Sequence, residues 1–421
     1  MKTLYTGNFV HRGNTNWTEK IYLAAFVCVL TAFFLKSTLF IPGRISYFFL
    51  YKFIQAASIL AVIKSLFIEQ KLTKEKIFYL AGLTCLFGLS FLANNFDLFY
   101  YFLFALSASR VDFHKILVVF FGVNFWGTLI VIFAEWINFI PNQVQFRPDQ
   151  PGLIRYSMGF SSPTDFSARV FYIILSYMLL KKFSLKFYDY LGIMLSTLVM
   201  YVITNARLDG LLIFLLLICT WVYPFVKVSI NKVSYLFWYA SSVIFICANI
   251  LIAFFYDPAN KILNRIDVIL SRRLTFGHAA LTRYKLGLVG KPIQEFGNGG
   301  LHPNPQNYFF IDSSYIRLLV MSGIIVFLLV LVLLYFIFFR IKLTRSTFFL
   351  IYVFFIILSS AFDQYFLDLS YNLLFFLLFA DLNWFIPNRM SERKENSKKL
   401  HTITGMELKR NGTNYMSKKT I

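Results

Sequence analysis

The sequence predicts an all-α, polytopic integral membrane protein with about twelve transmembrane helices and one large extracytoplasmic loop. Of its 421 residues, 58% are hydrophobic and 52 are Phe. The mean hydropathy is +0.64, which is not typical of a soluble globular protein. Apolar runs approaching or exceeding the roughly twenty residues that span a bilayer recur along the chain.

The predicted spans follow one another closely, and the third and fourth could instead form one helical hairpin. They cover residues 21–35, 45–68, 77–93, 96–108, 116–139, 166–180, 187–204, 208–226, 233–255, 315–339, 347–361 and 371–386. Residues 1–386 therefore constitute the predicted membrane domain. Residues 387–421 are polar and basic, which predicts a disordered cytoplasmic tail.

The distribution of basic residues orients these helices. Most Lys and Arg residues fall in alternate connections, together with both terminal segments, and basic residues mark the cytoplasmic side of short loops. We therefore expect both termini in the cytoplasm and residues 256–314 on the outer face. The formal net charge of +21 fits attraction to anionic lipid headgroups, so no nucleic-acid partner is expected.

Familiar catalytic motifs do not occur in the sequence. There is no Walker A loop, no His-Glu-x-x-His zinc pair, no Gly-x-Ser-x-Gly elbow and no dinucleotide fingerprint. The four cysteines all fall within predicted spans and show no metal-ligand spacing. We therefore expect neither a metal nor a cofactor.

Three outer segments hold nearly all the polar residues that a structural helix bundle does not need. The first, residues 141–165, contains Arg147 and Arg155. The second is a tight turn with Arg207 and Asp209, and the third is the large loop. Arg207 either reaches lipid phosphates or holds an anionic ligand. Asp209 either caps the next helix or belongs to the same site.

Two further arginines lie in or beside apolar runs. Arg169 falls inside the predicted sixth span, and Arg317 begins the tenth. Each could extend to the interface, and Arg169 could pair with Asp165 four residues earlier. Charged residues within a membrane usually face a cavity, so both are candidates for substrate binding.

The large loop combines arginines with possible proton acceptors. Residues 271–284 predict a short helix, because apolar residues recur at near-helical spacing. Arg272, Arg273 and Arg283 would lie near its surface, and the guanidinium fork binds phosphate oxygens bidentately. The candidate general bases are His278, His302 and Asp312, although Asp312 could instead cap the next helix.

Four short blocks then point to a family. Residues 159–168 read GFSSPTDFSA, residues 204–207 read TNAR, residues 269–281 read ILSRRLTFGHAAL followed by YKLGLVG at 284–290, and residues 311–324 read IDSSYIRLLVMSGI. In this order they resemble the Wzy-type polysaccharide polymerases of capsule and exopolysaccharide clusters, within the O-antigen ligase and polymerase superfamily. Arg272 stands where Gly is common in the family, so Arg273 is the matching arginine. Ala206 stands where the superfamily often has Ser.

The resemblance implies a metal-independent, inverting glycosyltransferase in the bacterial cytoplasmic (inner) membrane. It would polymerise polyprenyl-pyrophosphate-linked oligosaccharide repeat units at the outer face of the bilayer, alongside a flippase and a chain-length regulator. A sugar hydroxyl would attack the anomeric carbon of the donor in one displacement. Arg273 and Arg207 would stabilise the departing pyrophosphate, helped by Arg283 or Arg147. His278 would be the base, with Asp312 as the alternative.

The other candidate residues would bind pyrophosphate or glycan; they are Arg155, Arg169, Arg272, Arg317, Asp209 and His302. We also expect Arg207, Arg273 and Arg283 to line one outward-facing cavity. Two other functions remain open: a ligase that transfers lipid-linked glycan to another acceptor, and a flippase or transporter of lipid-linked oligosaccharide. A transporter usually places its site near the bilayer midplane, whereas the polar residues here concentrate in outer segments.

Overall fold

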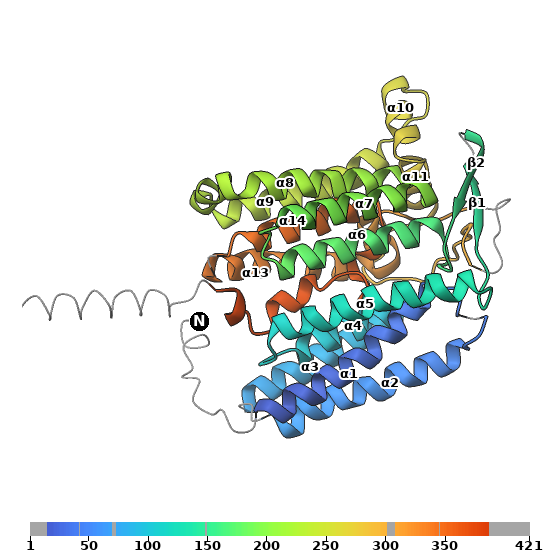
Figure 1. Ribbon diagram of the computed structural model, residues 1–421. Coiled ribbons are helices and arrows are strands. Elements are labelled where there is room, and N and C mark those ends of the chain that lie inside the picture. The colour runs from blue at the N-terminus through green and yellow to red at the C-terminus, as the bar shows by residue number, and fades with distance from the viewer. Residues whose placement is uncertain are drawn as a thin grey trace, which may run out of the picture. The chain divides into compact units, whose positions relative to one another are not determined.

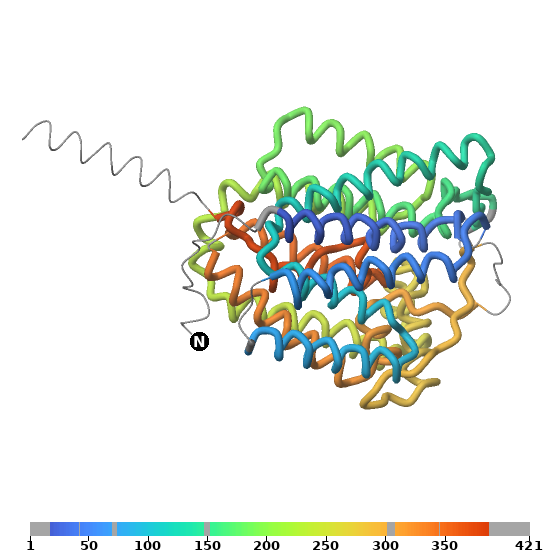
Figure 2. The backbone as a smooth tube through the Cα atoms, turned by 90° about the horizontal axis from the view of Figure 1, so that it is seen from below, coloured from blue at the N-terminus to red at the C-terminus, as the bar shows by residue number. Residues whose placement is uncertain are grey.

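The computed structural model describes residues 15–41, 43–69, 73–147, 150–300, 308–344 and 346–386. Its long helices lie side by side in one bundle (Figure 1). The bundle belongs to a compact unit that ends at Trp384. Both views place the short helices of the large loop at one end of the bundle (Figure 1; Figure 2). The predicted tail, residues 387–421, lies outside the described residues.

The long helices make up most of the described chain. They are α1 (Thr15–Lys36), α2 (Tyr47–Ile63, continued by the π-helix η2, Lys64–Ile68), α3 (Thr73–Ala93), α4 (Asp97–Ser107), α5 (Phe113–Trp136), α6 (Pro163–Leu180), α7 (Phe187–Thr204), α8 (Arg207–Lys232), α9 (Tyr235–Phe254), α13 (Gly323–Thr344) and α14 (Phe348–Ser360). The shorter elements are the strands β1 (Val144–Arg147) and β2 (Gln150–Tyr156), the helices α10 (Lys261–Ile269), α11 (Arg273–Arg283) and α12 (Ser314–Arg317), the π-helix η3 (Leu318–Ser322), and the 3-10 helices η4 (Tyr365–Leu367), η5 (Leu374–Leu378) and η6 (Asn383–Phe385).

Eight helices of the described chain are long and apolar enough to cross a bilayer. They span Trp17–Lys36, Tyr47–Ile68, Lys74–Ala93, Phe113–Trp136, Phe187–Thr204, Arg207–Lys232, Tyr235–Phe254 and Ser314–Thr344. Large apolar side chains stay exposed on them, such as Leu195, Leu198 and Val202 on α7, and such surfaces suit contact with lipid. The prediction of a mostly helical membrane protein is confirmed.

The predicted span at residues 371–386 is wrong. These residues form only short 3-10 turns, separated by irregular backbone, and most of their side chains are buried. An apolar run has the same composition whether it is a spanning helix or a segment buried within the protein. Two further predicted spans, now α4 and α14, are helices of only 11 and 13 residues.

After α14 the chain returns through the bundle without forming a long helix. We call residues 361–382 the return segment. Irregular backbone at membrane depth requires protein groups to satisfy its hydrogen bonds, and Asn372 supplies several of them. Its Nδ2 donates to the carbonyl oxygens of Tyr365 at 2.8 Å and Phe366 at 3.2 Å, and its Oδ1 accepts from the Leu374 amide at 3.1 Å.

Arg169 fastens the return segment to the bundle. Its side chain is fully buried in α6, and Nη1 donates to Asn124 Oδ1 of α5 at 2.7 Å and to the Ser370 carbonyl oxygen. Nη2 donates to Ser37 Oγ at 2.8 Å and to Ser370 Oγ at 3.1 Å. The guanidinium lies 3.6 Å from the Tyr371 ring centroid. Both terminal nitrogens are therefore occupied by protein groups, and Arg169 is structural here.

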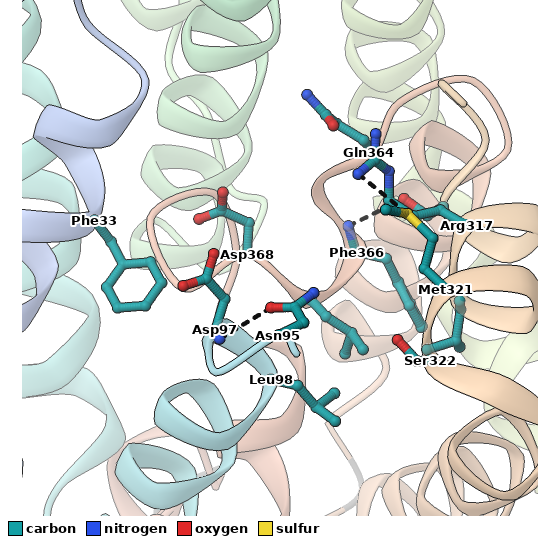
Figure 3. A pocket seen from close by; sticks show the side chains of 13 residues that line it. Phe33, Asn95, Asp97, Leu98, Arg317, Met321, Ser322, Gln364, Phe366 and Asp368 are labelled. Carbon is teal, nitrogen blue, oxygen red and sulfur yellow. Dashed lines mark hydrogen bonds between the residues drawn. The ribbon is translucent and has the colours of Figure 1, made fainter. Parts of the chain in front are cut away.

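The tenth predicted span is interrupted near its beginning. The helix passes through η3 and restarts at Gly323, which has a φ of +88°. The first amides of α13 donate to loop carbonyls: Ile324 N to Gly287 O at 3.0 Å and Ile325 N to Leu288 O at 3.1 Å. These bonds satisfy donors that a helix start leaves unpaired. Figure 3 shows Met321 of this break beside a pocket.

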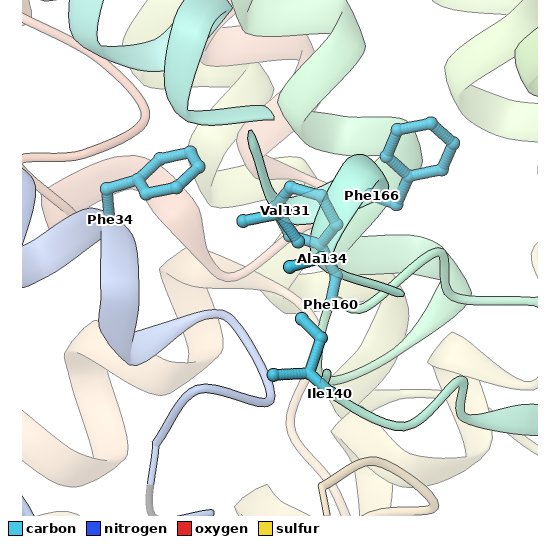
Figure 4. Packing of buried hydrophobic residues seen from close by; sticks show 6 residues of the cluster. All are labelled: Phe34, Val131, Ala134, Ile140, Phe160 and Phe166. Atoms are coloured by element: carbon cyan, nitrogen blue, oxygen red, sulfur yellow. The ribbon is translucent and has the colours of Figure 1, made fainter. Parts of the chain in front are cut away.

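Strands β1 and β2 form a hairpin, and a buried apolar cluster packs at the end of the bundle beside it. Its members are Phe34, Val131, Ala134, Ile140, Phe160 and Phe166 (Figure 4). They join α1 and α5 to Phe160, in the loop that follows β2, and to Phe166, in α6. The Phe160 and Phe166 rings stack with their centroids 5.5 Å apart. The hairpin itself is antiparallel, with Val144 opposite Tyr156. This packing fixes the start of α6, which contributes to the site described next.

Candidate functional site

A buried arginine lies at the end of the bundle that carries the loop helices. Arg273 begins α11, and its side chain is 10% exposed. Its Nε donates to the Phe362 carbonyl oxygen at 2.6 Å, and Nη2 lies 3.5 Å from Asp363 Oδ1. The sequence predicted α11 correctly but placed Arg273 near the surface. The side chain points inward because α11 packs on α9 and α12, beside the return segment.

Three carboxylates act on this guanidinium, and one of them, Asp363, lies within ion-pair distance of it. Asp209, Asp312 and Asp363 all interact electrostatically with Arg273. Asp209 is buried in the first turn of α8 and accepts a hydrogen bond from Ser167 Oγ of α6. The Asp363 carbonyl oxygen accepts one from Ser314 Oγ of α12. Four helices and the return segment thus converge on one arginine–carboxylate cluster.

The surroundings shift the pKa of Asp312 and of Arg273 in the same direction. Burial raises the pKa of Asp312, and the positive charges of Arg273 and Arg317 only partly oppose this rise. Burial alone would lower the pKa of Arg273, but Asp312, Asp363 and Asp209 outweigh it, and the net pKa is raised. Arg273 therefore stays charged, while Asp312 can take up a proton at a higher pH than an exposed aspartate.

Arg155 and Tyr308 complete the cluster from the two outer segments. Arg155 lies on β2, and its Nε donates to the Thr204 carbonyl oxygen at the end of α7 at 2.6 Å. Its charge acts on both Asp209 and Tyr308. Burial, and then Asp312, raise the pKa of the Tyr308 phenol. Arg155 thus brings positive charge from β2 to Asp209 and to Tyr308 of the large loop.

Asp267 positions α11, and it was not singled out from the sequence. Its Oδ1 accepts hydrogen bonds from the amides of Leu274 at 2.8 Å and Thr275 at 3.1 Å, at the start of the helix. Its Oδ2 accepts from Thr275 Oγ1 at 2.5 Å and from Tyr256 Oη at 3.1 Å. The carboxylate thus caps the helix that carries Arg273.

The predicted residues divide into those within the cluster and those outside it. Arg155, Asp209, Arg273 and Asp312 lie within it, and Arg317 acts on Asp312 from the other end of α12. Arg169 lies outside the cluster, and its guanidinium is hydrogen-bonded to Asn124 and Ser37 in the core. Arg207 begins α8, two residues before Asp209.

The remaining loop candidates face other surroundings. His278 packs against the end of α9, with Nδ1 3.2 Å and 3.0 Å from the carbonyl oxygens of Ala253 and Phe254. The Arg272 side chain is 56% exposed, with Nη1 3.7 Å from Asp267. Arg283 is exposed, 5.4 Å from the Phe309 ring centroid, whereas Arg273 is buried. His302 and the side chain of Arg147 lie outside what the structure describes.

Asp363 is the main residue that sequence reasoning missed. It follows an apolar run directly, in the sequence Ala361-Phe362-Asp363, and falls between two predicted spans. A lone carboxylate at the end of an apolar run was the available signal, because charged groups at membrane depth are usually functional. Its partner Arg273 lies 90 residues earlier in the chain, and no local pattern connects the two.

The cluster can exchange protons and bind charged groups. Among the residues that the structure describes, no group of three or more His, Cys, Asp or Glu side chains is arranged to hold a metal ion.

No protein-family model, curated protein or solved structure matches the chain.

Proposed function

We propose that the protein is a membrane glycosyltransferase that polymerises polyprenyl-pyrophosphate-linked oligosaccharide repeat units. In this proposal it lies in the bacterial cytoplasmic membrane, with both termini in the cytoplasm and the cluster on the outer side. Its further partners are the flippase and the chain-length regulator of the same pathway. The resemblance of the four sequence blocks and the position of the cluster support this assignment together.

The observation that carries the proposal is the convergence of Arg273 with Asp209, Asp312 and Asp363. Burying Asp209 and Asp363 in an apolar bundle is costly, and such groups in membrane proteins usually serve a function. Three of the four resembling blocks contribute to the cluster: the start of α6 through Ser167, α11 through Arg273, and α12 with the preceding Asp312. Arg273 and Asp312 of the cluster therefore belong to blocks that prompted the family hypothesis, whereas Asp209 and Asp363 lie outside those blocks.

In the proposed reaction, a hydroxyl of the acceptor sugar attacks the anomeric carbon of the donor. The new bond joins the hydroxyl oxygen to this carbon, while the bond from the carbon to the pyrophosphate oxygen breaks. Asp312 accepts the hydroxyl proton, and the electron pair leaves with the polyprenyl pyrophosphate. One displacement inverts the anomeric configuration. We favour Asp312 over His278 as the base because Asp312 lies within the cluster.

The arginines divide the electrostatic work in this proposal. Arg273 is bonded to the Phe362 carbonyl and lies beside Asp363, so it orients the Asp363 carboxylate and offsets part of the negative charge of the site. Arg207 is half-buried and Arg283 is exposed, and they provide the more accessible forks for pyrophosphate oxygens. Arg155 adds positive charge from β2. Preorganised charge of this kind stabilises a departing anion.

The test uses a strain that lacks the gene, complemented with wild type, Asp312→Asn or the control Asp257→Asn. Asp257 lies exposed in the same loop and its Oδ1 accepts only a local hydrogen bond, so the control makes the same chemical change away from the cluster. Lipid-linked glycans are extracted and sized by mass spectrometry, and protein levels are measured in parallel. We expect Asp312→Asn to accumulate single repeat units on the lipid at the outer face.

Other outcomes would identify other functions. Lipid-linked polymer of normal length that never reaches its final acceptor would identify a ligase. Single units retained on the cytoplasmic face would identify a flippase. Normal polymer in the Asp312→Asn strain would remove Asp312 from the mechanism.

A further inference from the structure

A polar cavity shares structural elements with the cluster. It has a volume of about 190 Å³ and lies between the start of α4, the helix break at η3 and the return segment. Figure 3 shows Phe33, Asp97 and Asp368 on one side, with Arg317 and Gln364 opposite. None of the residues in the proposed mechanism lines it, so its polar groups need another explanation.

The cavity shares structural elements with the cluster. Ser314 lines it, and Ser314 Oγ donates to the Asp363 carbonyl oxygen. Gln364 follows Asp363 in the chain and also lines the cavity. Arg317 contributes to the cavity and acts electrostatically on Asp312. A ligand here would therefore contact Arg317, whose charge acts on the proposed base.

Two charged side chains of the cavity keep unused hydrogen-bonding capacity. Asp97 Oδ2 lies 2.6 Å from Lys36 Nζ, but Asp97 Oδ1 is buried and has no hydrogen-bond partner among the described residues. Arg317 Nη2 pairs with both oxygens of Glu295 at 2.7 Å and 2.8 Å, while its Nη1 contacts only Met321 Sδ, at 3.6 Å. A guanidinium nitrogen bonded only to a sulfur atom, a weak acceptor, retains hydrogen-bonding capacity, so Arg317 Nη1 can donate to a ligand, and Asp97 adds its negative charge to the lining.

The chemistry of the lining favours a neutral ligand with many hydroxyls. Asp97 and Asp368 would repel an anion, and Arg317 would repel a cation. A hydroxyl both donates and accepts hydrogen bonds, so it suits carboxylate, amide and guanidinium groups equally. The Phe33 and Phe366 side chains add apolar surface. The volume is below the roughly 300–1,000 Å³ of drug-sized sites, which suits one sugar ring.

From these observations we infer that the cavity binds the terminal sugar ring of the acceptor glycan. This inference rests on the proposed function, because it makes the cavity the acceptor side of the same transfer. Its position beside Asp312 would bring the attacking hydroxyl to the base. The donor pyrophosphate would then approach from the side of Arg207 and Arg283.

The experiment measures saccharide binding separately from transfer. The probe is the free oligosaccharide released by mild acid from the lipid-linked repeat units of the host strain. Its binding to the full-length protein in lipid nanodiscs is measured by calorimetry for wild type, Gln364→Leu and Asp97→Asn. The control is Gln55→Leu, the same change at an exposed position of α2 that does not line the cavity. Thermal melting checks the folding of each variant.

We expect Gln364→Leu to bind the oligosaccharide about 3- to 10-fold more weakly, the effect of losing one hydrogen-bonding group. In transfer assays the same variant should raise KM for lipid-linked repeat units and leave kcat nearly unchanged. Asp97→Asn should also weaken binding, and Gln55→Leu should match wild type.

The results separate the two proposals. If wild type forms no polymer but binds the oligosaccharide in a Gln364-dependent way, the polymerase proposal fails and the saccharide site stands. If wild type forms polymer, while folded Gln364→Leu and Asp97→Asn bind the oligosaccharide as wild type does, the cavity is not the acceptor site. Absence of binding to wild type at millimolar oligosaccharide would also overturn the inference.

Discussion

Replacing Arg169 with Met distinguishes a structural arginine from one that binds substrate. Met fills a similar volume with a flexible apolar chain, but it removes four hydrogen bonds that the guanidinium donates. The acceptors belong to Ser37, Asn124 and Ser370. No carboxylate of the described chain lies within ion-pair distance of Arg169. Its direct contacts are therefore hydrogen bonds and aromatic rings, while its charge also acts on Asp165 and Asp368 at longer range.

The expected cost follows from these contacts. A hydrogen bond from a charged group contributes about 1.5–3 kcal/mol, so four contribute roughly 6–12 kcal/mol. Burying the ion costs several kcal/mol, and the substitution recovers that amount. A net destabilisation of about 3–5 kcal/mol remains. With an unfolding entropy of about 2.1 cal/mol/K per residue, this corresponds to a fall of roughly 3–6 °C in the melting midpoint.

The assay is thermal unfolding in lipid nanodiscs, with Arg283→Met as the matched control. Arg283 is exposed and contacts only the face of Phe309 among the interactions described, so its replacement should change stability by less than about 0.5 kcal/mol. An Arg169→Met protein that melts like wild type but has lost transfer activity would refute the structural role. Arg169 would then have to act on substrate.

Three further predictions concern the site and its supports. Asp312→Asn should abolish transfer yet melt at or above the wild-type temperature. Burial raises the Asp312 pKa, so the stability that its protonated form contributes is present at low pH and lost as the pH rises through the raised value. The transfer rate of the wild type should rise with pH through the raised pKa of Asp312, which lies above the ordinary aspartate pKa of 3.8. A rate that already saturates near pH 3.8 would contradict the assignment of Asp312 as the base. Arg272→Gly should stabilise the protein by about 1 kcal/mol, since Arg272 has a φ of +66°, and a lower melting temperature would show that its exposed contacts matter more. Gly290→Ala should yield little folded protein, because its Cβ would lie 2.1 Å from the Met321 carbonyl oxygen. The control Gly88→Ala should fold normally, because a Cβ there meets open space. Equal yields of the two variants would show that the loop around Gly290 can move away.

The sequence by itself determined the class of protein and most of its helices. Long apolar runs predict membrane helices because hydrophobic length is a local property of the chain. The loop helix α11 was predicted for the same reason, from the spacing of apolar residues over three turns. Arg155, Asp209, Arg273 and Asp312 were singled out because polar residues between apolar runs are conspicuous. Their membership in one cluster did not follow from that pattern.

Only the tertiary structure decided which charged residues meet. Arg273 bonds to Phe362, 89 residues away, and Arg169 bonds to Ser370, 201 residues away. Both arginines carry the same side chain, yet Arg169 is held by hydroxyl, amide and carbonyl groups of the core, whereas Arg273 forms an ion pair with Asp363. The irregular structure of the return segment could not be predicted either, because its apolar composition matches that of a membrane helix. Its irregular backbone is stable because residues distant in sequence supply its hydrogen bonds, and such contacts leave no periodic signal in the chain.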